Sequence, residues 1–187
     1  IVLRVSTGRN RSRVDIDNEA VAELLSLVDL AKSNLYEAED LRLEVPSTVY
    51  RHAFRAFEEL RQERELRTFA DLVFDPAKLL VHGTGQAQQR AHAIASNRYK
   101  HIILDEYQDI NKAQYEFCRL LSRRDRNLCV VGDDDQSIYA FRGADSKYIL
   151  NFEDDFKNSV VIKLEENYRS TTHILDPANA LVKNNPK

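Results

Sequence analysis

The sequence contains no methionine and no tryptophan, only two cysteines, and few glycines and prolines. The missing methionine, the initiator included, indicates a segment of a longer chain or a sequence whose modified methionines are left out. Cys118 and Cys129 are not in CxxC spacing and lie in apolar surroundings. We therefore expect reduced core thiols rather than a disulfide framework. The five histidines form no HExxH or Cys/His cluster, which argues against a zinc site.

Long apolar runs are absent as well. No stretch reaches the roughly 18 residues that a membrane helix needs, and no signal-peptide pattern opens the chain. Charged residues make up 30% and hydrophobic residues 43% of the 187 positions. This profile is typical of a soluble globular protein, with one domain or a small domain plus a partial one. The net charge of −3 gives no overall basic signature for nucleic acid, although a basic stripe can lie on an acidic protein.

The first part of the chain has helical periodicity. Residues 1–13 mix apolar and basic side chains and indicate a frayed or displaced end. A helix is predicted from Asp17, a good N-cap residue, and a second one from Pro46-Ser47. The apolar faces consist of Val21, Leu24, Leu25, Val28, Ala31 and Leu35 in the first helix, and of Ala53, Phe54, Phe57 and Leu60 in the second.

The second of these helices carries mixed charges on its other face. The arginines are Arg51, Arg55, Arg61 and Arg64, and they stand among Glu58, Glu59 and Glu63. This mixture favours a solvated face with ion pairs along the helix. The alternative is that the arginines contact a DNA backbone.

From Tyr99 onward, predicted strands and helices alternate. Short apolar strands bounded by helices predict a parallel sheet covered on both faces. The stretch 82–98 before them is rich in Gln, Ala and His and predicts a loop and a short helix. Pro177 should kink the last helix or mark its true start. The predicted strands are His101–Leu104, Leu128–Val131 and Val160–Leu164, and the helices are about Lys112–Leu121, a short one near Asp145–Phe152, and one from Ser170.

Acidic residues directly follow two of the predicted strands. Asp105 and Glu106 end the first strand in IILDEYQD (102–109), and three acids follow Gly132 in GDDDQSIYAFRGA (132–144). Open α/β sheets bind their ligands at the carboxyl ends of parallel strands. A carboxylate there can hold Mg²⁺ beside a nucleoside triphosphate, and a neighbouring one can handle a water molecule. In LEENYRST (164–171), Tyr168 and Arg169 follow the third strand. The three segments together indicate most of one half of a nucleotide-hydrolysing site.

Plainer interpretations exist for each segment. The Asp105-Glu106 pair could only cap the helix that starts near Asn111. Asp133–Asp135 could form an ordinary solvated acidic turn, which is the interpretation we prefer for Asp134. Ser170 could be a simple helix cap with Tyr168 and Arg169 as surface residues.

In this order and spacing, the three segments resemble motifs II, III and IV of superfamily 1 DNA helicases of the UvrD/Rep/PcrA type. We call them the motif II, motif III and motif IV segments. The resemblance runs from about Phe69 to Asn184, and residues 68–72 resemble the F-D-D-L return segment with Ala70 in place of an acid. It implies an α/β fold, namely a partial RecA-like P-loop NTPase parallel sheet preceded by an α-helical subdomain. Residues 1–80 would form the helical insertion with its return segment, and residues 81–187 the C-terminal part of the first motor domain.

The resemblance also implies roles in nucleotide chemistry. Asp105 would bind Mg²⁺, and Glu106 would orient and deprotonate the attacking water. Gln136 would sense the γ-phosphate by exchanging hydrogen-bond partners. Tyr168 would stack on the adenine of ATP, and the planar guanidinium of Arg169 would stabilise charge on the γ-phosphate.

A second set of roles concerns DNA. Tyr139, Phe141 and Arg142 would contact single-stranded DNA, with aromatic faces stacking on bases. The family usually has tryptophan where this chain has Phe141, which reduces the stacking area. Gln108 and Asp109 would link the hydrolytic site to the DNA side. The implied partners of the parent protein are single-stranded DNA and single-strand/duplex junctions, and its expected location is the bacterial cytoplasm or nucleoid.

A P-loop is missing from these residues. It requires GxxxxGK[ST], and no glycine of this chain is followed by lysine. Gly83-Thr84-Gly85-Gln86 is only superficially similar. Family members have the P-loop upstream of the helical insertion and a second motor domain downstream. We therefore expect a central segment of an ATP-dependent helicase that is inactive alone. The alternative is a degenerate, non-hydrolysing module that binds DNA or protein, although Asp105, Glu106, Gln136 and Arg169 favour the hydrolytic parent.

Overall fold

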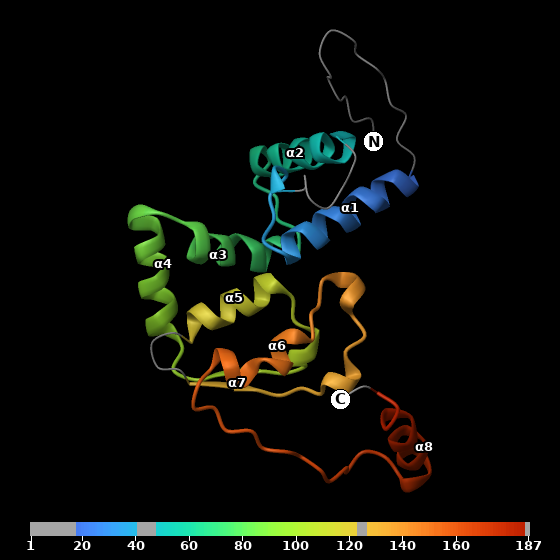
Figure 1. The fold of residues 1–187 in the computed structure, drawn as a ribbon. Coiled ribbons are helices and arrows are strands. Elements are labelled where there is room, and N and C mark those ends of the chain that lie inside the picture. The colour runs from blue at the N-terminus through green and yellow to red at the C-terminus, as the bar shows by residue number, and fades with distance from the viewer. Residues whose placement is uncertain (1–17, 41–47, 123–126, 186–187) are drawn as a thin grey trace.

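The structure is a computed structural model that describes residues 18–40, 48–122 and 127–185. It is mixed α/β, mostly helical, with a small parallel pair of strands (Figure 1). The predicted displaced end at 1–13, the N-cap at Asp17 and the helix start at Pro46-Ser47 lie outside the described residues. Within those ranges, no helix is both long enough and apolar enough to cross a bilayer.

Helices α1 (Asn18–Ser33) and α2 (Thr48–Glu63) confirm the predicted helical periodicity. Val28 and Phe54 are almost fully buried between the two helices. Leu25 and Leu60, which were assigned to the apolar faces, are exposed instead. The buried face of each helix is therefore narrower than the apolar face predicted from the sequence. The shared core of the two helices consists of Leu24, Val28, Ala31, Ala38, Ala53 and Phe54.

Two further helices connect this pair to the sheet. Helix α3 spans Asp71–His82, and α4 spans Gly85–Arg98. The prediction of a loop and a short helix for 82–98 is wrong, because α4 is a full helix of 14 residues. Glutamine, alanine and arginine are good helix formers even without an apolar stripe. The helix is held by Ala95, which packs against Leu80 and Leu120, and by side chains of Gln88 and His92 that each lie 3.1 Å from the carbonyl oxygen of Leu80.

Strands β1 (Ile102–Leu104) and β2 (Leu128–Val130) form the parallel pair, and α5 (Lys112–Leu121) crosses between them. Both strands and α5 confirm the sequence prediction. The side chain of Asn111 accepts a hydrogen bond from Gln114 N, and Gln114 returns one to Asn111 N. This capping box starts α5, so the interpretation of Asp105-Glu106 as its cap is wrong.

The predicted third strand at Val160–Leu164 is not a strand in the structure. Val160, Val161, Ile162 and Leu164 are exposed, because the described strands β1 and β2 pair only with each other and leave this segment without a ladder partner. An apolar run alone cannot form a strand without a neighbour to satisfy its backbone groups. Helix α8 (Thr172–Val182) follows this extended segment and runs through Pro177 rather than starting there.

The β1–β2 pair is covered on one face only, which corrects the expectation of two covered faces. Leu104 and Val130 pack with Tyr107 and Tyr148 against the short helices α6 (Lys147–Leu150) and α7 (Phe152–Asp155). The middle residues of the strands, Ile103 and Cys129, are exposed. Cys129 is therefore not a core residue, whereas Cys118 is half-buried, and burial raises the pKa of its thiol to about 11. Both cysteines are free.

A buried network of charges joins α1, α2 and α3, and the sequence analysis missed it. Lys32 Nζ lies 2.6 Å from Asp71 Oδ1 and 2.6 Å from Glu58 Oε1, with both Lys32 and Asp71 side chains fully buried. The other oxygen of Asp71 accepts hydrogen bonds from Thr68 N at 2.7 Å and Thr68 Oγ1 at 2.8 Å. The only signal in the sequence is a lysine inside the apolar stripe of the first helix.

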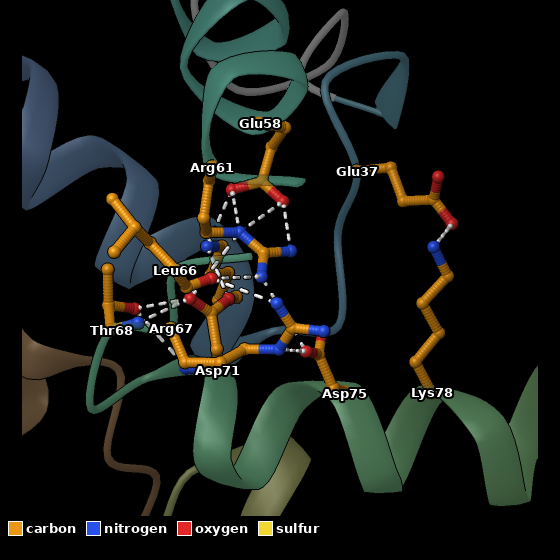
Figure 2. Close-up of polar contacts among 10 residues, drawn as sticks. Glu37, Glu58, Arg61, Leu66, Arg67, Thr68, Asp71, Asp75 and Lys78 are labelled. Atoms are coloured by element: carbon orange, nitrogen blue, oxygen red, sulfur yellow. Dashed lines mark hydrogen bonds and ion pairs between the residues drawn. The ribbon is translucent and has the colours of Figure 1, made fainter. Parts of the chain in front are cut away.

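Arg61 belongs to this network and not to a solvated face, which corrects its predicted position. Its guanidinium lies 2.8 Å from Glu58 Oε2 and 3.5 Å from Asp71 Oδ2, and it donates to the carbonyl oxygen of Leu66 at 3.3 Å (Figure 2). Arg55, on the same helix, pairs with Glu39 at the surface at 2.7 Å. The predicted ion pair along the helix is therefore present between Arg61 and Glu58, three residues apart, but Arg61 is buried and not solvated, and Arg55 pairs with a residue outside the helix.

Candidate active site

The carboxyl ends of β1 and β2 meet at one edge of the sheet. Leu104 is in register with Val130, and Val131 N donates to the carbonyl oxygen of Leu104 at 2.8 Å. Tyr107 N then donates to the carbonyl oxygen of Val131 at 2.9 Å. These bonds hold the motif II and motif III segments side by side, as the sequence predicted for acids that follow adjacent parallel strands.

Glu106 has a left-handed backbone, with φ 53° and ψ 44°. This conformation is unfavourable for a residue with a Cβ and stores strain on the order of 1 kcal/mol or more. Glu106 N donates to Asp105 Oδ1 at 3.0 Å, and Gln108 Nε2 donates to Glu106 Oε2 at 2.8 Å. Both carboxylates are exposed. The strained turn therefore presents Asp105 and Glu106 to solvent together, with Glu106 fixed by the buried Gln108.

An aromatic layer lies directly beneath this turn. Tyr107 is buried and meets Phe152 edge-on, with ring centroids 5.6 Å apart. Tyr115 stacks on Tyr148 at 4.3 Å. Burial, followed by a hydrogen bond to Asp155, raises the pKa of Tyr115, so the phenol stays neutral and donates to that carboxylate at 2.8 Å. The rigid packing of these rings gives the motif II turn a fixed support.

Asp133 organises the motif III segment. It precedes the short 3-10 helix η3 (Asp134–Gln136). Its Oδ1 accepts from Asp135 N at 3.1 Å, and its Oδ2 accepts from Gln136 Nε2 at 2.7 Å. Gln136 is exposed, so its amide can exchange Asp133 for another partner. Asp134 contributes only a backbone carbonyl to the turn, accepting from Ser137 N at 3.3 Å, in agreement with the interpretation of Asp134 as a turn residue.

The three residues predicted to engage DNA lie together around the 3-10 helix η4 (Ala140–Arg142). The guanidinium carbon of Arg142 is 5.4 Å from the ring centroid of Tyr139 and 5.3 Å from that of Phe141. The two rings are 6.0 Å apart and tilted by 48°. All three side chains are exposed. Such a group offers aromatic faces and a cation to a single strand.

The loop that carries this cluster packs on the end of helix α1. Gly143 has φ +85°, and a Cβ added there would lie 3.0 Å from Ser33 Cβ and 3.3 Å from Leu30 Cδ1. Two features therefore favour glycine at this position: the left-handed backbone conformation and the close approach of the loop to α1. Helix α1 thus helps to set the position of Tyr139, Phe141 and Arg142. The sequence analysis missed this contact, for which the Arg-Gly-Ala tripeptide is the only signal.

We expect Gly143→Ala to destabilise the 187-residue chain by about 2 to 3 kcal/mol, from strain at positive φ and from the clash with Ser33. Gly85→Ala is the matched control, because Gly85 has φ +68° but nothing within 4 Å of its added Cβ. The control should lose only about 1 kcal/mol. Urea unfolding followed by circular dichroism measures both. Equal losses in the two variants would show that the contact between Gly143 and α1 contributes nothing.

The structure does not bring the motif IV residues to the strand ends. Tyr168 is 87% exposed, and its hydroxyl donates to Glu166 Oε2 at 2.7 Å. Asn167 Oδ1 accepts from Arg169 N at 2.9 Å and from Ser170 N at 2.8 Å. Figure 1 shows that the extended segment before α8 runs outside the helices packed on the sheet. Tyr168 and Arg169 therefore remain candidates on sequence grounds alone.

Within the part of the chain that the structure describes, no metal site made only of protein ligands is found. In the described ranges, no three His, Cys, Asp or Glu side chains are grouped so that they could hold an ion. Mg²⁺ differs from zinc and calcium in that it is commonly bound by one or two carboxylates, several waters and substrate phosphates. The exposed carboxylate of Asp105 fits that pattern.

Comparison with known proteins identifies the family. Residues 4–157 match the family model described as UvrD/REP helicase N-terminal domain. The chain is 39% identical over 168 residues to the ATP-dependent DNA helicase PcrA of Staphylococcus epidermidis, covering 89% of this chain and 22% of that protein. It is 41% identical over 149 residues to the ATP-dependent DNA helicase PcrA of Staphylococcus aureus strain Mu50, covering 80% of this chain and 19% of that protein. The chain spans about a fifth of the length of these curated relatives. Because the family model matches most of the length of the chain, the chain belongs to the UvrD/Rep family of helicases.

Proposed function

We propose that this chain is part of an ATP-dependent DNA helicase that couples ATP hydrolysis to movement along single-stranded DNA and to unwinding of duplex. The main support is the register of β1 and β2, which sets Asp105 and Glu106 beside Asp133 and Gln136. Residues 1–80 act as the helical insertion and return segment, and residues 81–187 as the C-terminal part of a RecA-like motor domain. We place the whole protein in the cytoplasm, in DNA replication, repair or recombination.

The proposed hydrolysis uses the carboxylates at the strand ends. Bound Mg²⁺, held by Asp105 together with the phosphates, would neutralise charge that develops on the γ-phosphate. Glu106 orients the attacking water and accepts its proton, for which an exposed carboxylate fixed by one hydrogen bond is suited. Gln136 contacts the γ-phosphate and otherwise donates to Asp133. Tyr168 stacks on adenine and Arg169 contacts the γ-phosphate, which requires their segment to lie closer to the strand ends than it does here.

The proposed DNA contact is the exposed group Tyr139, Phe141 and Arg142. Base stacking on an aromatic side chain contributes about 1 to 3 kcal/mol per base. Because η4 follows η3 with only three residues between them, a change in the partner of Gln136 is transmitted over a short length of backbone. The partners are single-stranded DNA and single-strand/duplex junctions.

Residues 1–187 alone would bind Mg·ATP weakly and would not hydrolyse it. They contain no glycine followed by lysine, so they lack the backbone cradle and the lysine that a P-loop supplies to the β- and γ-phosphates. A second candidate function, a non-hydrolysing module that binds DNA or protein, would need only the exposed group Tyr139, Phe141 and Arg142. The two candidates differ in whether ATP drives any change in DNA.

The test is strand separation by the whole protein that contains this segment. With Mg·ATP it should release the fluorescent strand of a partial duplex, and without ATP it should not. Phe141→Ala should lower the rate by about tenfold through lost stacking. Tyr99→Ala is the matched control, since Tyr99 is 50% exposed and lies between α4 and the amino end of β1, opposite the motif II segment. DNA binding with no ATP-dependent strand release would favour the non-hydrolysing module instead.

A further inference from the structure

A single buried amide, that of Gln108, joins the two halves of the candidate site. Gln108 is 1% exposed. Its Oε1 accepts from Asp133 N at 3.0 Å, and its Nε2 donates to Glu106 Oε2 at 2.8 Å and to Asp109 Oδ2 at 3.3 Å. A backbone N–H can only donate and an ionised carboxylate can only accept. The amide therefore satisfies all three neighbours in this orientation and none of them when reversed.

The space around this amide is closed. A Cβ added at Gly132 would lie 2.7 Å from Gln108 Oε1 and 3.1 Å from Tyr107 N. Gly132 is therefore required by the close approach of Gln108. On the other side, Ser137 Oγ donates to the backbone carbonyl of Gln108 at 3.3 Å. Gln108 thus contacts the motif III segment through both its side chain and its backbone.

Gln108 lies between two groups that must act together in the proposed hydrolysis. One side is Glu106, whose exposed carboxylate accepts a hydrogen bond from Gln108 Nε2 at 2.8 Å. The other side is Asp133, which accepts from Gln136 at 2.7 Å. The chain of hydrogen bonds from Glu106 through Gln108 and Asp133 to Gln136 is continuous.

We propose that Gln108 is a positioning residue, which rests on the proposed function: it fixes the water-activating carboxylate of Glu106 and the loop of Gln136 as one unit. It touches neither substrate nor metal. Its role is to keep the base and the γ-phosphate contact in one relative position, so that a change at Gln136 alters the position of Glu106 as well.

Three substitutions test the hydrogen bonds that this amide makes on its two sides. Gln108→Glu keeps an oxygen acceptor for Asp133 N but turns its other oxygen toward the carboxylates of Glu106 and Asp109, where like charges repel. Gln108→Met has a similar length and loses all three hydrogen bonds of the amide. Gly132→Ala keeps the glutamine itself but crowds its Oε1, and it also crowds Ile149 Cδ1 at 2.9 Å. Gln89→Glu, at an exposed position of α4, introduces the same charge change away from the site.

The experiment measures ATP hydrolysis by the whole protein in the presence of single-stranded DNA. Gln108→Glu should lower kcat by roughly 10- to 100-fold while KM for ATP stays within about threefold of wild type, because positioning is lost and not nucleotide binding. The kcat of Gly132→Ala should fall by a similar factor, and the kcat of Gln89→Glu should match that of the wild type. The second readout is amide hydrogen exchange at Asp133 without nucleotide. Exchange should be about tenfold faster in Gln108→Met, since the N–H loses its acceptor, and unchanged in Gln108→Glu.

The outcomes discriminate between this inference and the function it rests on. Normal kcat in Gln108→Glu, beside a strong loss in Glu106→Gln, would overturn the positioning role and leave the proposed function standing. A rise in KM equal to the fall in kcat would also overturn it, since that result indicates lost nucleotide binding in addition to lost turnover. A wild-type protein without ATP hydrolysis would overturn the proposed function itself. Unchanged exchange at Asp133 in Gln108→Met would refute the hydrogen bond on which the inference depends.

Discussion

Glu106→Gln should lower the DNA-stimulated ATPase rate of the whole protein by roughly two orders of magnitude or more, with nucleotide affinity within about threefold of wild type. Glutamine is nearly isosteric with glutamate, and its carbonyl oxygen can still accept the hydrogen bond that Gln108 Nε2 now gives to Glu106. The fold of the turn is therefore retained, while the group that accepts the proton of the attacking water is lost.

The measurement is steady-state phosphate release together with fluorescent-nucleotide binding. Glu63→Gln is the control, because it removes one negative charge at an exposed position of α2. The control should behave as wild type in both assays. If Glu106→Gln turned ATP over at a rate near wild type, Glu106 could not be the base, and its exposed carboxylate would need another role.

Lys32→Met should destabilise the 187-residue chain by about 3 kcal/mol or more. The substitution leaves Asp71 and Glu58 without the ammonium group that now lies 2.6 Å from each. Lys78→Met is a matched control, because Lys78 lies 2.7 Å from Glu37 but the two side chains are 41% and 50% exposed. The control should lose only about 0 to 1 kcal/mol. Urea unfolding of both variants measures the difference, and similar losses would show that burial does not strengthen the Lys32 network.

The effect of Lys32→Met should also depend on pH. Burial by itself would raise the pKa of Asp71, but hydrogen bonds from Lys32 and Thr68 outweigh it and hold the pKa below its ordinary value of 3.8. Ionised Asp71 therefore stabilises the fold above that pH, and the contribution is lost as the pH falls through the lowered pKa. The difference in the free energy of unfolding between wild type and Lys32→Met should thus become smaller when unfolding is measured in acid. A difference that is constant from neutral pH into acid would contradict this account.

The sequence predicted best those elements whose signals are local. The helix predicted at about Lys112–Leu121 agrees with α5, where Asn111 and Gln114 form a capping box and an apolar face follows. The motif II and motif III segments lie side by side because a crossover helix makes β1 and β2 parallel, and parallel strands end at the same edge. The group of Tyr139, Phe141 and Arg142 was implied by the resemblance to the helicase family, and the three lie together around η4 because they are close in sequence.

Features that depend on distant partners were not predictable in the same way. Lys32 and Asp71 are 39 residues apart, and no local pattern links them. The segment 160–164 has the composition of a strand, but a strand also needs a neighbour, and the described strands offer none. Cys129 looked buried because apolar residues surround it in sequence, whereas alternation along β2 turns its side chain to the uncovered face. Tyr168 and Arg169 depend on the position of that same unpaired segment.

Phosphate release by the whole protein, with and without single-stranded DNA, tests the central claim most directly. The claim is that the acids at the ends of β1 and β2 belong to an ATP-hydrolysing site coupled to the exposed group at η4. We expect Mg²⁺-dependent hydrolysis that single-stranded DNA stimulates by about tenfold or more, and a loss of that stimulation in a Tyr139→Ala/Phe141→Ala double variant. Hydrolysis that DNA leaves unchanged, or no hydrolysis by a folded whole protein that binds DNA, would contradict the account.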